Sequence, residues 1–215
     1  MSVDGKGQKP RKKKKLGVSG DELEKLVERA KDGDVEAFHQ IYDIFGERIL
    51  NYIYRLTSSR EDAEDLAQDT FILAFRKLGT LKDNRKIQSW LYRIAQNNVF
   101  QKYRGKKHYF ESIDEDEAME LPETQRHGVP SKSPEESILS GELGELVEKV
   151  ISELPPKYRE VFVLSAIQKM SYQDISEVVG RSLASVKSDI HRARVQVRDK
   201  IKEYLGENYG MSQSF

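Results

Sequence analysis

The sequence predicts an all-α protein made of two small helical domains that are joined by an acidic, flexible linker. Apolar residues recur at steps of three and four through most of the chain, which is the periodicity of an amphipathic helix. No segment of any length shows the alternating pattern of a strand. Hydrophobic residues make up 37% of the chain and charged residues 33%, a composition that suits small helical bundles better than one large α/β core.

An N-terminal domain is expected over residues 19–107, after a disordered basic tail at residues 1–18. The tail is rich in Gly and Lys and has too little apolar surface to fold. Ser19 and Glu22 have the spacing of a capping box, which predicts the start of the first helix. The helices of this domain are expected to begin near residues 19, 35, 59 and 87. The apolar stripes of the second and third helices, Tyr42 and Phe75 included, are expected to be buried in the core.

A change of composition separates this domain from the next one. Acidic residues follow one another from Glu111 to Glu123 with no intervening Lys or Arg, in a stretch too polar to fold alone. Ser133, Pro134 and Glu136 then take the N-cap, first-turn and capping-box positions of a new helix. We therefore expect, in chain order, an acidic linker at 108–133, a second helical domain at 134–207 and a tail at 208–215.

The second domain ends in the pattern of a helix-turn-helix. Ser171 and Asp174 cap a short helix, Gly180 ends it, and a long basic helix starts at Ser182. Cationic and small polar groups at the start of such a helix can reach base edges and phosphates in the major groove. A helical hairpin with a solvated basic face is the alternative that the pattern leaves open.

Several segments of this domain resemble the C-terminal domain of extracytoplasmic-function (ECF) sigma factors. They read LPPKYREVF from Leu154, MSYQDIS from Met170, VKS from Val186 and HRAR from His191. The resemblance implies that the last helix recognises the −35 promoter element. The residues that it places nearest the DNA are Arg181, Ser182, Ser185, Lys187, Ser188, His191 and Arg192. Asp189 stands where the family usually has a basic residue, and we expect a solvent-facing or salt-bridging side chain there rather than a base reader.

The third helix carries a second family motif. Ile72 and Leu73 project among acidic residues, and exposed apolar residues rimmed by charge often mark a partner site. The run DAEDLAQDTF, from Asp62 to Phe71, resembles the sigma-factor segment that docks on the clamp helices of RNA polymerase. This resemblance implies that Asp65, Gln68 and Asp69 contact the polymerase, and the projecting Ile72 is assigned to the same polymerase-binding surface. Acids that only favour the N-terminal half of the helix through its dipole are the alternative reading.

The face of the fourth helix opposite the core interleaves cations and aromatic rings, an arrangement that suits single-stranded nucleic acid. Lys102 and Tyr103 are expected to extend this face. The segment SWLYRIAQN, from Ser89, is similar to a family signature, which implies that this helix and the loop before it capture an extruded base of the −10 element. The residues assigned to −10 binding are Arg85, Lys86, Arg93, Asn97, Phe100 and Arg104.

Other classes of protein find little support in the sequence. The chain has no cysteine, which excludes a disulfide framework, a thiolate zinc site and a cysteine nucleophile. It has no phosphate-binding Gly-rich loop and no HExxH motif, and its histidines have no metal-ligand spacing. No signal peptide and no apolar run long enough to cross a bilayer is seen. We therefore expect a cytoplasmic protein that is not an enzyme, has no cofactor or metal, and does not bind a membrane.

The resemblances identify the chain as an ECF sigma factor. They imply as partners core RNA polymerase, promoter DNA (double-stranded at −35, single-stranded at −10) and an anti-sigma factor. A helix-turn-helix regulator that binds its operator without polymerase is the alternative, but it leaves the motifs of the third and fourth helices unexplained. The acidic linker either occupies the RNA path of the polymerase, as the family suggests, or is a solvated spacer. The basic tail is expected to add nonspecific DNA affinity or to aid solubility only.

Overall fold

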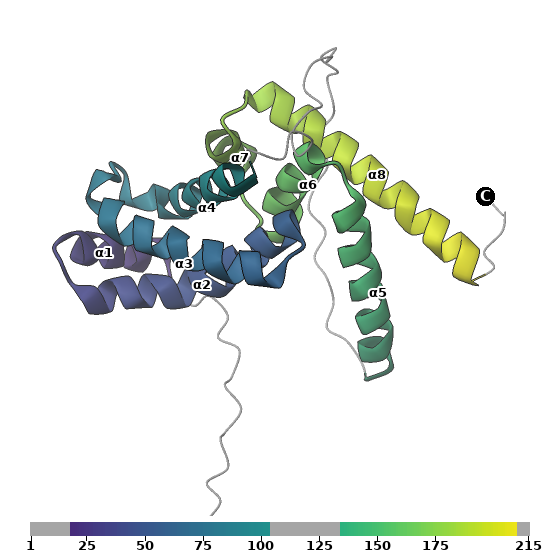
Figure 1. Cartoon of the computed structure of the whole chain (residues 1–215), viewed down its shortest axis with the longest axis horizontal. Helices are drawn as coiled ribbons and strands as arrows, with labels where there is room; N and C mark the ends of the chain where they lie inside the picture. Colours follow the sequence, from purple (N-terminus) through teal and green to yellow (C-terminus); the bar gives the residue numbers. More distant parts are fainter. Residues whose placement is uncertain (1–17, 104–133, 210–215) are drawn as a thin grey trace, which may run out of the picture.

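The computed structural model describes the backbone of residues 18–103 and 134–209, and the side chains of residues 18–103 and 144–206. Every regular element in these ranges is helical, which confirms the predicted all-α class (Figure 1). Arg104 and the acidic linker lie outside the described residues, as does nearly all of the basic tail.

The N-terminal module consists of α1 (Gly20–Lys31), α2 (Val35–Thr57), α3 (Arg60–Lys77), the short turns η1 (Leu78–Thr80) and η2 (Asn84–Lys86), and α4 (Ile87–Tyr103). The C-terminal module consists of α5 (Pro134–Glu153), α6 (Pro156–Phe162), η3 (Val163–Ile167), α7 (Tyr172–Val179) and α8 (Leu183–Tyr209).

The helix ends carry the caps that the sequence predicts. The Glu22 backbone N–H donates to Ser19 Oγ at 3.2 Å, and the Ser19 N–H donates to the Glu22 carboxylate at 2.8 Å, which completes the capping box. At the start of α7 the Asp174 N–H donates to Ser171 Oγ at 3.1 Å. Gly180 ends α7 with a φ of +66°, a left-handed conformation that glycine adopts at no steric cost. The helix-turn-helix of α7 and α8 is therefore present as predicted.

The N-terminal module is a bundle in which α2 and α3 lie side by side and α4 packs against both. Ile41, Phe45 and Ile49 of α2 are buried in its core. The expectation that Tyr42 and Phe75 are buried is wrong, because they are 48% and 50% exposed. Their rings pack edge-on against neighbouring rings at one border of the α2–α3 contact, where none of the described helices covers them.

The C-terminal module is organised around α8. Helices α5, α6 and α7 all contact it, and Figure 1 shows α5 and the C-terminal half of α8 diverging as two arms. Val161, Leu164 and Ile190 are buried where α6, η3 and α8 meet. The last helix continues to Tyr209, two residues beyond the expected domain limit at 207.

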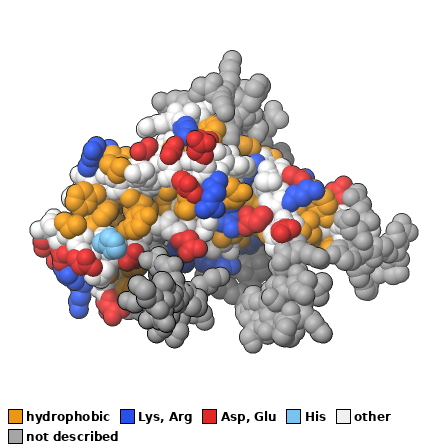
Figure 2. Space-filling view, turned by 60° about the horizontal axis from the view of Figure 1, so that its bottom comes forward, with side chains coloured by type: hydrophobic (Ala, Val, Ile, Leu, Met, Phe, Trp, Pro, Cys, Tyr) orange, Lys and Arg blue, Asp and Glu red, His pale blue; other side chains and the backbone are white. Residues whose placement is uncertain are grey.

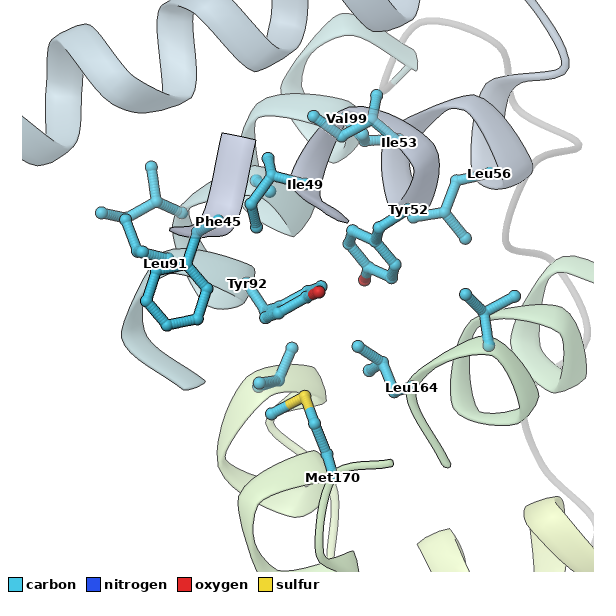
Figure 3. Close-up of a cluster of buried hydrophobic side chains, with 14 of the residues drawn as sticks. Phe45, Ile49, Tyr52, Ile53, Leu56, Leu91, Tyr92, Val99, Leu164 and Met170 are labelled. Atoms are coloured by element: carbon cyan, nitrogen blue, oxygen red, sulfur yellow. The ribbon is translucent and has the colours of Figure 1, made fainter. Parts of the chain in front are cut away.

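The two modules also pack directly against each other. Helix α4 contacts α7, and α2 contacts α5, α6 and η3. Figure 3 shows Tyr52 and Tyr92 of the N-terminal module pointing toward Leu164 and Met170 of the C-terminal module, and these residues belong to one continuous hydrophobic core. The order of helices along the chain did not predict this shared core.

Candidate functional site

The residues assigned to polymerase binding form one exposed face of α3. Asp65, Gln68, Asp69 and Ile72 are all exposed, and their spacing of three and four places them along one side of the helix. Ile72 is 43% exposed, which is high for a large apolar side chain on a bundle. We call these four residues the docking face.

Asp62, in the same motif, has a different place. Lys102 Nζ lies 2.5 Å from its carboxylate, and the hydroxyl of Tyr103 donates to the other oxygen. These hydrogen bonds, the one from Lys102 first, hold the pKa of Asp62 below its usual value. Asp62 therefore joins α3 to the end of α4, and its carboxylate contributes to holding the two helices together.

A groove of about 970 Å³ runs beside the docking face, between α2 and α3. Gln68 and Ile72 line it together with the exposed rings of Tyr42 and Phe75. Figure 2 shows a band of hydrophobic side chains across this module, bordered by acidic and basic groups. The groove is an apolar surface that the helical periodicity had assigned to the core.

The residues assigned to the −10 element are only partly brought together. Arg93 and Asn97 are exposed on one side of α4. Phe100 is half-buried and lines a small pocket with Pro156 and Arg159 of α6, so its ring borders the C-terminal module. The expected extension of this face by Lys102 and Tyr103 is wrong, because Tyr103 is buried and both side chains bond to Asp62.

The loop before α4 is held by ion pairs. Arg85 Nε lies 3.0 Å from the Asp83 carboxylate, and its side chain is exposed. Lys86 reaches across to the C-terminal module, where its ammonium lies 2.7 Å from Asp174 and 3.2 Å from Glu177 of α7. The hydrogen bond from Lys86 to Asp174 is the main cause that raises the pKa of Lys86. Lys86 is thus engaged within the chain.

The residues assigned to the −35 element lie at the start of α8, apart from Arg181. Ser182, Lys187 and His191 are exposed, and Ser185, Ser188 and Arg192 are half-buried on the same part of the helix. Arg181 differs: its guanidinium lies 2.5 Å from the Asp189 carboxylate and 3.5 Å from that of Glu160.

Asp189 is fully buried, so the solvent-facing alternative for this residue is wrong and the salt-bridging one is right. Lys157 Nζ of α6 lies 3.4 Å from its second oxygen. The ion pair with Arg181 links the turn of the helix-turn-helix to the second turn of α8. It also gives the buried carboxylate the cationic partner that it needs. This pairing also removes Arg181 from the group of side chains that project toward solvent.

Two exposed residues at the start of α8 were not among the predicted contacts with the −35 element. Leu183 is 37% exposed and Ala184 is exposed as well. Residues in the first turn of a recognition helix contact base edges, and apolar side chains there can touch a thymine methyl group. Their position directly after the Gly180 turn places them in the first turn of α8, and this could have been read from the sequence.

No described helix has the length and apolar character needed to cross a membrane. In residues 18–103 and 144–206 no group of three or more His, Asp and Glu side chains is placed to hold a metal ion.

The family models that match the chain and the proteins most similar to it agree with one another. The model of the Sigma-70 region 2 family matches residues 41–109, and that of Sigma-70 region 4 matches residues 144–197. The chain is 33% identical to the ECF RNA polymerase sigma factor SigW of Bacillus subtilis, over 84% of this chain and 97% of SigW. It is 31% identical to the RNA polymerase sigma-H factor of Pseudomonas aeruginosa, over 86% of this chain and 96% of that protein.

Solved structures with the same fold include CnrH, determined in complex with the cytosolic domain of CnrY. The TM-score is 0.61 at 25% identity, and the match covers 84% of this chain and 97% of CnrH. The sigma factor RpoE of Bartonella quintana, determined with the anti-sigma factor NepR, has a TM-score of 0.57 at 21% identity. That match covers 77% of this chain and 96% of RpoE.

Proposed function

Because the chain belongs to the family of ECF RNA polymerase sigma factors, we propose that its docking face on α3 binds core RNA polymerase and that α4 and α8 recognise the −10 and −35 promoter elements. The observation that carries this assignment is the exposure of Asp65, Gln68, Asp69 and Ile72 on one side of α3, next to an apolar groove. A face that mixes carboxylates with apolar atoms suits a partner with basic and apolar groups.

The test of this function is initiation in a reconstituted system. Purified chain and core polymerase should together produce transcripts from defined start sites on genomic DNA, and neither should do so alone. An operator-binding regulator would protect its DNA site without polymerase. Sequence-specific footprints that are the same with and without core enzyme would therefore support that rival and contradict our proposal.

The two modules can share promoter recognition because their weak contacts with DNA are carried by one chain. Each promoter element meets a small patch, and a linker raises the effective concentration of the second contact once the first has formed.

We further propose an anti-sigma partner, for which the α2–α3 groove offers an apolar surface fit for an amphipathic helix. Such a partner should compete with core polymerase for the chain. Simultaneous binding of both would contradict this assignment.

Asn97→Ala is expected to slow open-complex formation more than it weakens closed binding. The exposed Asn97 amide is a candidate for hydrogen bonds to a flipped −10 base, and losing a base-edge contact costs about 1–2 kcal/mol, roughly tenfold. Permanganate footprinting of the melted region, beside a filter-binding assay of closed complexes, measures the two steps. Asn51→Ala, the same change at an exposed position of α2, is the control. Equal losses in both steps would argue against base capture.

Lys187→Ala is expected to weaken binding to the −35 element and to reduce the salt dependence of that binding. The exposed ammonium can neutralise one phosphate, and each such contact contributes about 0.9 to the slope of log K against log salt concentration. Titration of holoenzyme with promoter DNA at several salt concentrations gives the slope. Lys202→Ala, far along α8, should leave it unchanged. An unaltered slope in Lys187→Ala would remove this residue from the interface.

A further inference from the structure

A lysine at the end of α1 holds the loop that precedes α4. Lys31, the last residue of α1, is half-buried. Its ammonium donates to the backbone carbonyl oxygen of Leu81 and, at 2.5 Å, to Oδ1 of Asn84. Hydrogen bonds from a charged donor are roughly twice as strong as those between neutral groups. Lys31 therefore joins α1 firmly to a segment that follows it 50 residues later in the chain.

The turn of the same loop is ordered from within. The Asp83 carboxylate accepts hydrogen bonds from the Arg85 backbone N–H at 3.1 Å and from Arg85 Nε at 3.0 Å. The Lys86 N–H donates to the Asp83 carbonyl oxygen at 3.0 Å. These bonds fix the shape of the turn, and the bonds from Lys31 fix where the turn lies relative to α1.

The bond from Lys31 also decides which end of the Asn84 amide is available to a ligand. An ammonium has donors and no acceptor, so the end of the amide that faces Lys31 has to be the oxygen. The NH2 group lies on the other side of the amide and carries only donors. Asn84 is half-buried, and an amide held in this way offers donors to a base that presents a carbonyl oxygen or a ring nitrogen.

Resting on the function proposed above, we propose that Lys31 is a positioning residue for −10 recognition, which holds the loop before α4 and turns the donors of Asn84 toward an extruded base. Lys31 acts through Asn84, as a supporting residue that keeps a binding group in one orientation. Without the ammonium the amide could turn over, and an amide that shows either end discriminates less between bases. The base preference of the chain at −10 then depends on a residue of α1, outside both the loop and α4.

The experiment uses the full chain with core polymerase and a fluorescent single-stranded DNA. The DNA carries the nontemplate −10 strand of a promoter mapped by the reconstituted transcription. Each position of the strand is filled in turn with each of the four bases, and the ratio of the best to the poorest affinity is measured at each position. In Lys31→Met, which keeps the apolar stem and removes the donors, the ratio at the position that Asn84 reads should fall about fivefold.

Two further variants of lysines on α1 serve as controls. Lys31→Arg keeps charged donors at the same place and should retain most of the wild-type ratio. Lys25→Met makes the matched change at an exposed position of α1 and should leave every ratio at the wild-type value.

Asn84→Asp separates the orientation of the side chain from its chemistry. The carboxylate keeps an oxygen toward Lys31 and replaces the NH2 group by an acceptor. The preference at the same position should therefore move toward bases that present an amino group. The loop should stay in place, so exchange of the Arg85 backbone amide in the free chain should keep its wild-type rate in Asn84→Asp. In Lys31→Met this exchange should become about tenfold faster.

The proposal is overturned if Lys31→Met lowers stability or speeds amide exchange but leaves every base ratio at the Lys25→Met value, because Lys31 would then have a structural role only. An unchanged preference in Asn84→Asp would overturn it as well. A wild-type holoenzyme with no base preference on this strand would instead contradict the proposed function. Amide exchange in the free chain needs neither polymerase nor DNA, and would still report whether Lys31 holds the loop.

Discussion

Asp69→Lys is expected to abolish the binding of the chain to core RNA polymerase and to leave its folding unchanged. Asp69 is exposed in the middle of the docking face on α3, so the substitution buries nothing and creates no cavity. In a complex it would set a cation against the basic groups expected on the partner. Losses at charged interface contacts are about 2–5 kcal/mol, roughly 30-fold or more in affinity.

Native gel shift or size-exclusion chromatography with core enzyme measures this loss, and circular dichroism melting checks the fold. Glu28→Lys, an exposed acid-to-lysine change on α1, is the control for altered net charge. Core affinity that stays within twofold (about 0.4 kcal/mol) of the wild-type value would rule out the docking face as the polymerase contact. A lowered melting temperature would instead show that Asp69 stabilises the fold.

Glu160→Gln is expected to stabilise the protein above neutral pH. Glu160 is 4% exposed, and burial raises its pKa from the ordinary 4.5 to about 7. The groups facing it are Tyr52 of α2, Gln96 of α4, Arg181 before α8 and Asp189 within α8. The Arg181 guanidinium, with hydrogen bonds from Gln96 and Tyr52, offsets part of the burial, and the Asp189 carboxylate adds to the rise in pKa.

The sign of the pH effect follows from this raised pKa. Below about pH 4.5 Glu160 is protonated in both folded and unfolded chains, and its full contribution to stability is present. As the pH rises to about 7 the unfolded chain ionises first, and the free energy of unfolding falls, by up to about 3 kcal/mol. Carboxylates with lowered pKa values, such as Asp62, lose their contribution only at lower pH.

Denaturant unfolding of wild type and Glu160→Gln at pH 5 and pH 8 tests this expectation, because the difference between the two proteins cancels the titration of every other group. The gap should widen in favour of Glu160→Gln as the pH rises. Glu145→Gln, an exposed position on α5, should follow the wild type. A gap that is independent of pH would show that Glu160 titrates alike in the folded and unfolded states.

Local signals in the sequence predicted the elements of this fold well. Ser19, Ser171 and Gly180 mark helix ends by the chemistry of their own side chain or backbone, and each acts within a few residues. Helical spacing also placed Asp65, Gln68, Asp69 and Ile72 away from the buried side of α3, whereas their assignment to polymerase binding rested mainly on the resemblance to the family motif. These predictions needed no knowledge of the tertiary structure.

The features that escaped prediction depend on distant parts of the chain. Periodicity shows that Phe75 lies on the apolar side of α3, but the width of the partner surface decides whether it is covered. Lys86 and Asp174 are 88 residues apart, and neither carries a local mark of the other. The sequence left open whether Asp189 faces solvent or forms a salt bridge, because the Arg181 and Lys157 charges that permit its burial come from other elements.

The buried pair of Asp189 and Arg181 limits how promoter preference can be re-engineered in this scaffold. A recognition helix transplanted from a relative with a basic residue in place of Asp189 would leave Arg181 and Lys157 facing a third cation. Removing one partner of a buried ion pair costs about 3–5 kcal/mol, a large share of the stability of a small domain. Chimeras should therefore keep Asp189 and exchange only the solvent-facing positions of α8, or exchange α6, the turn and α8 as one block.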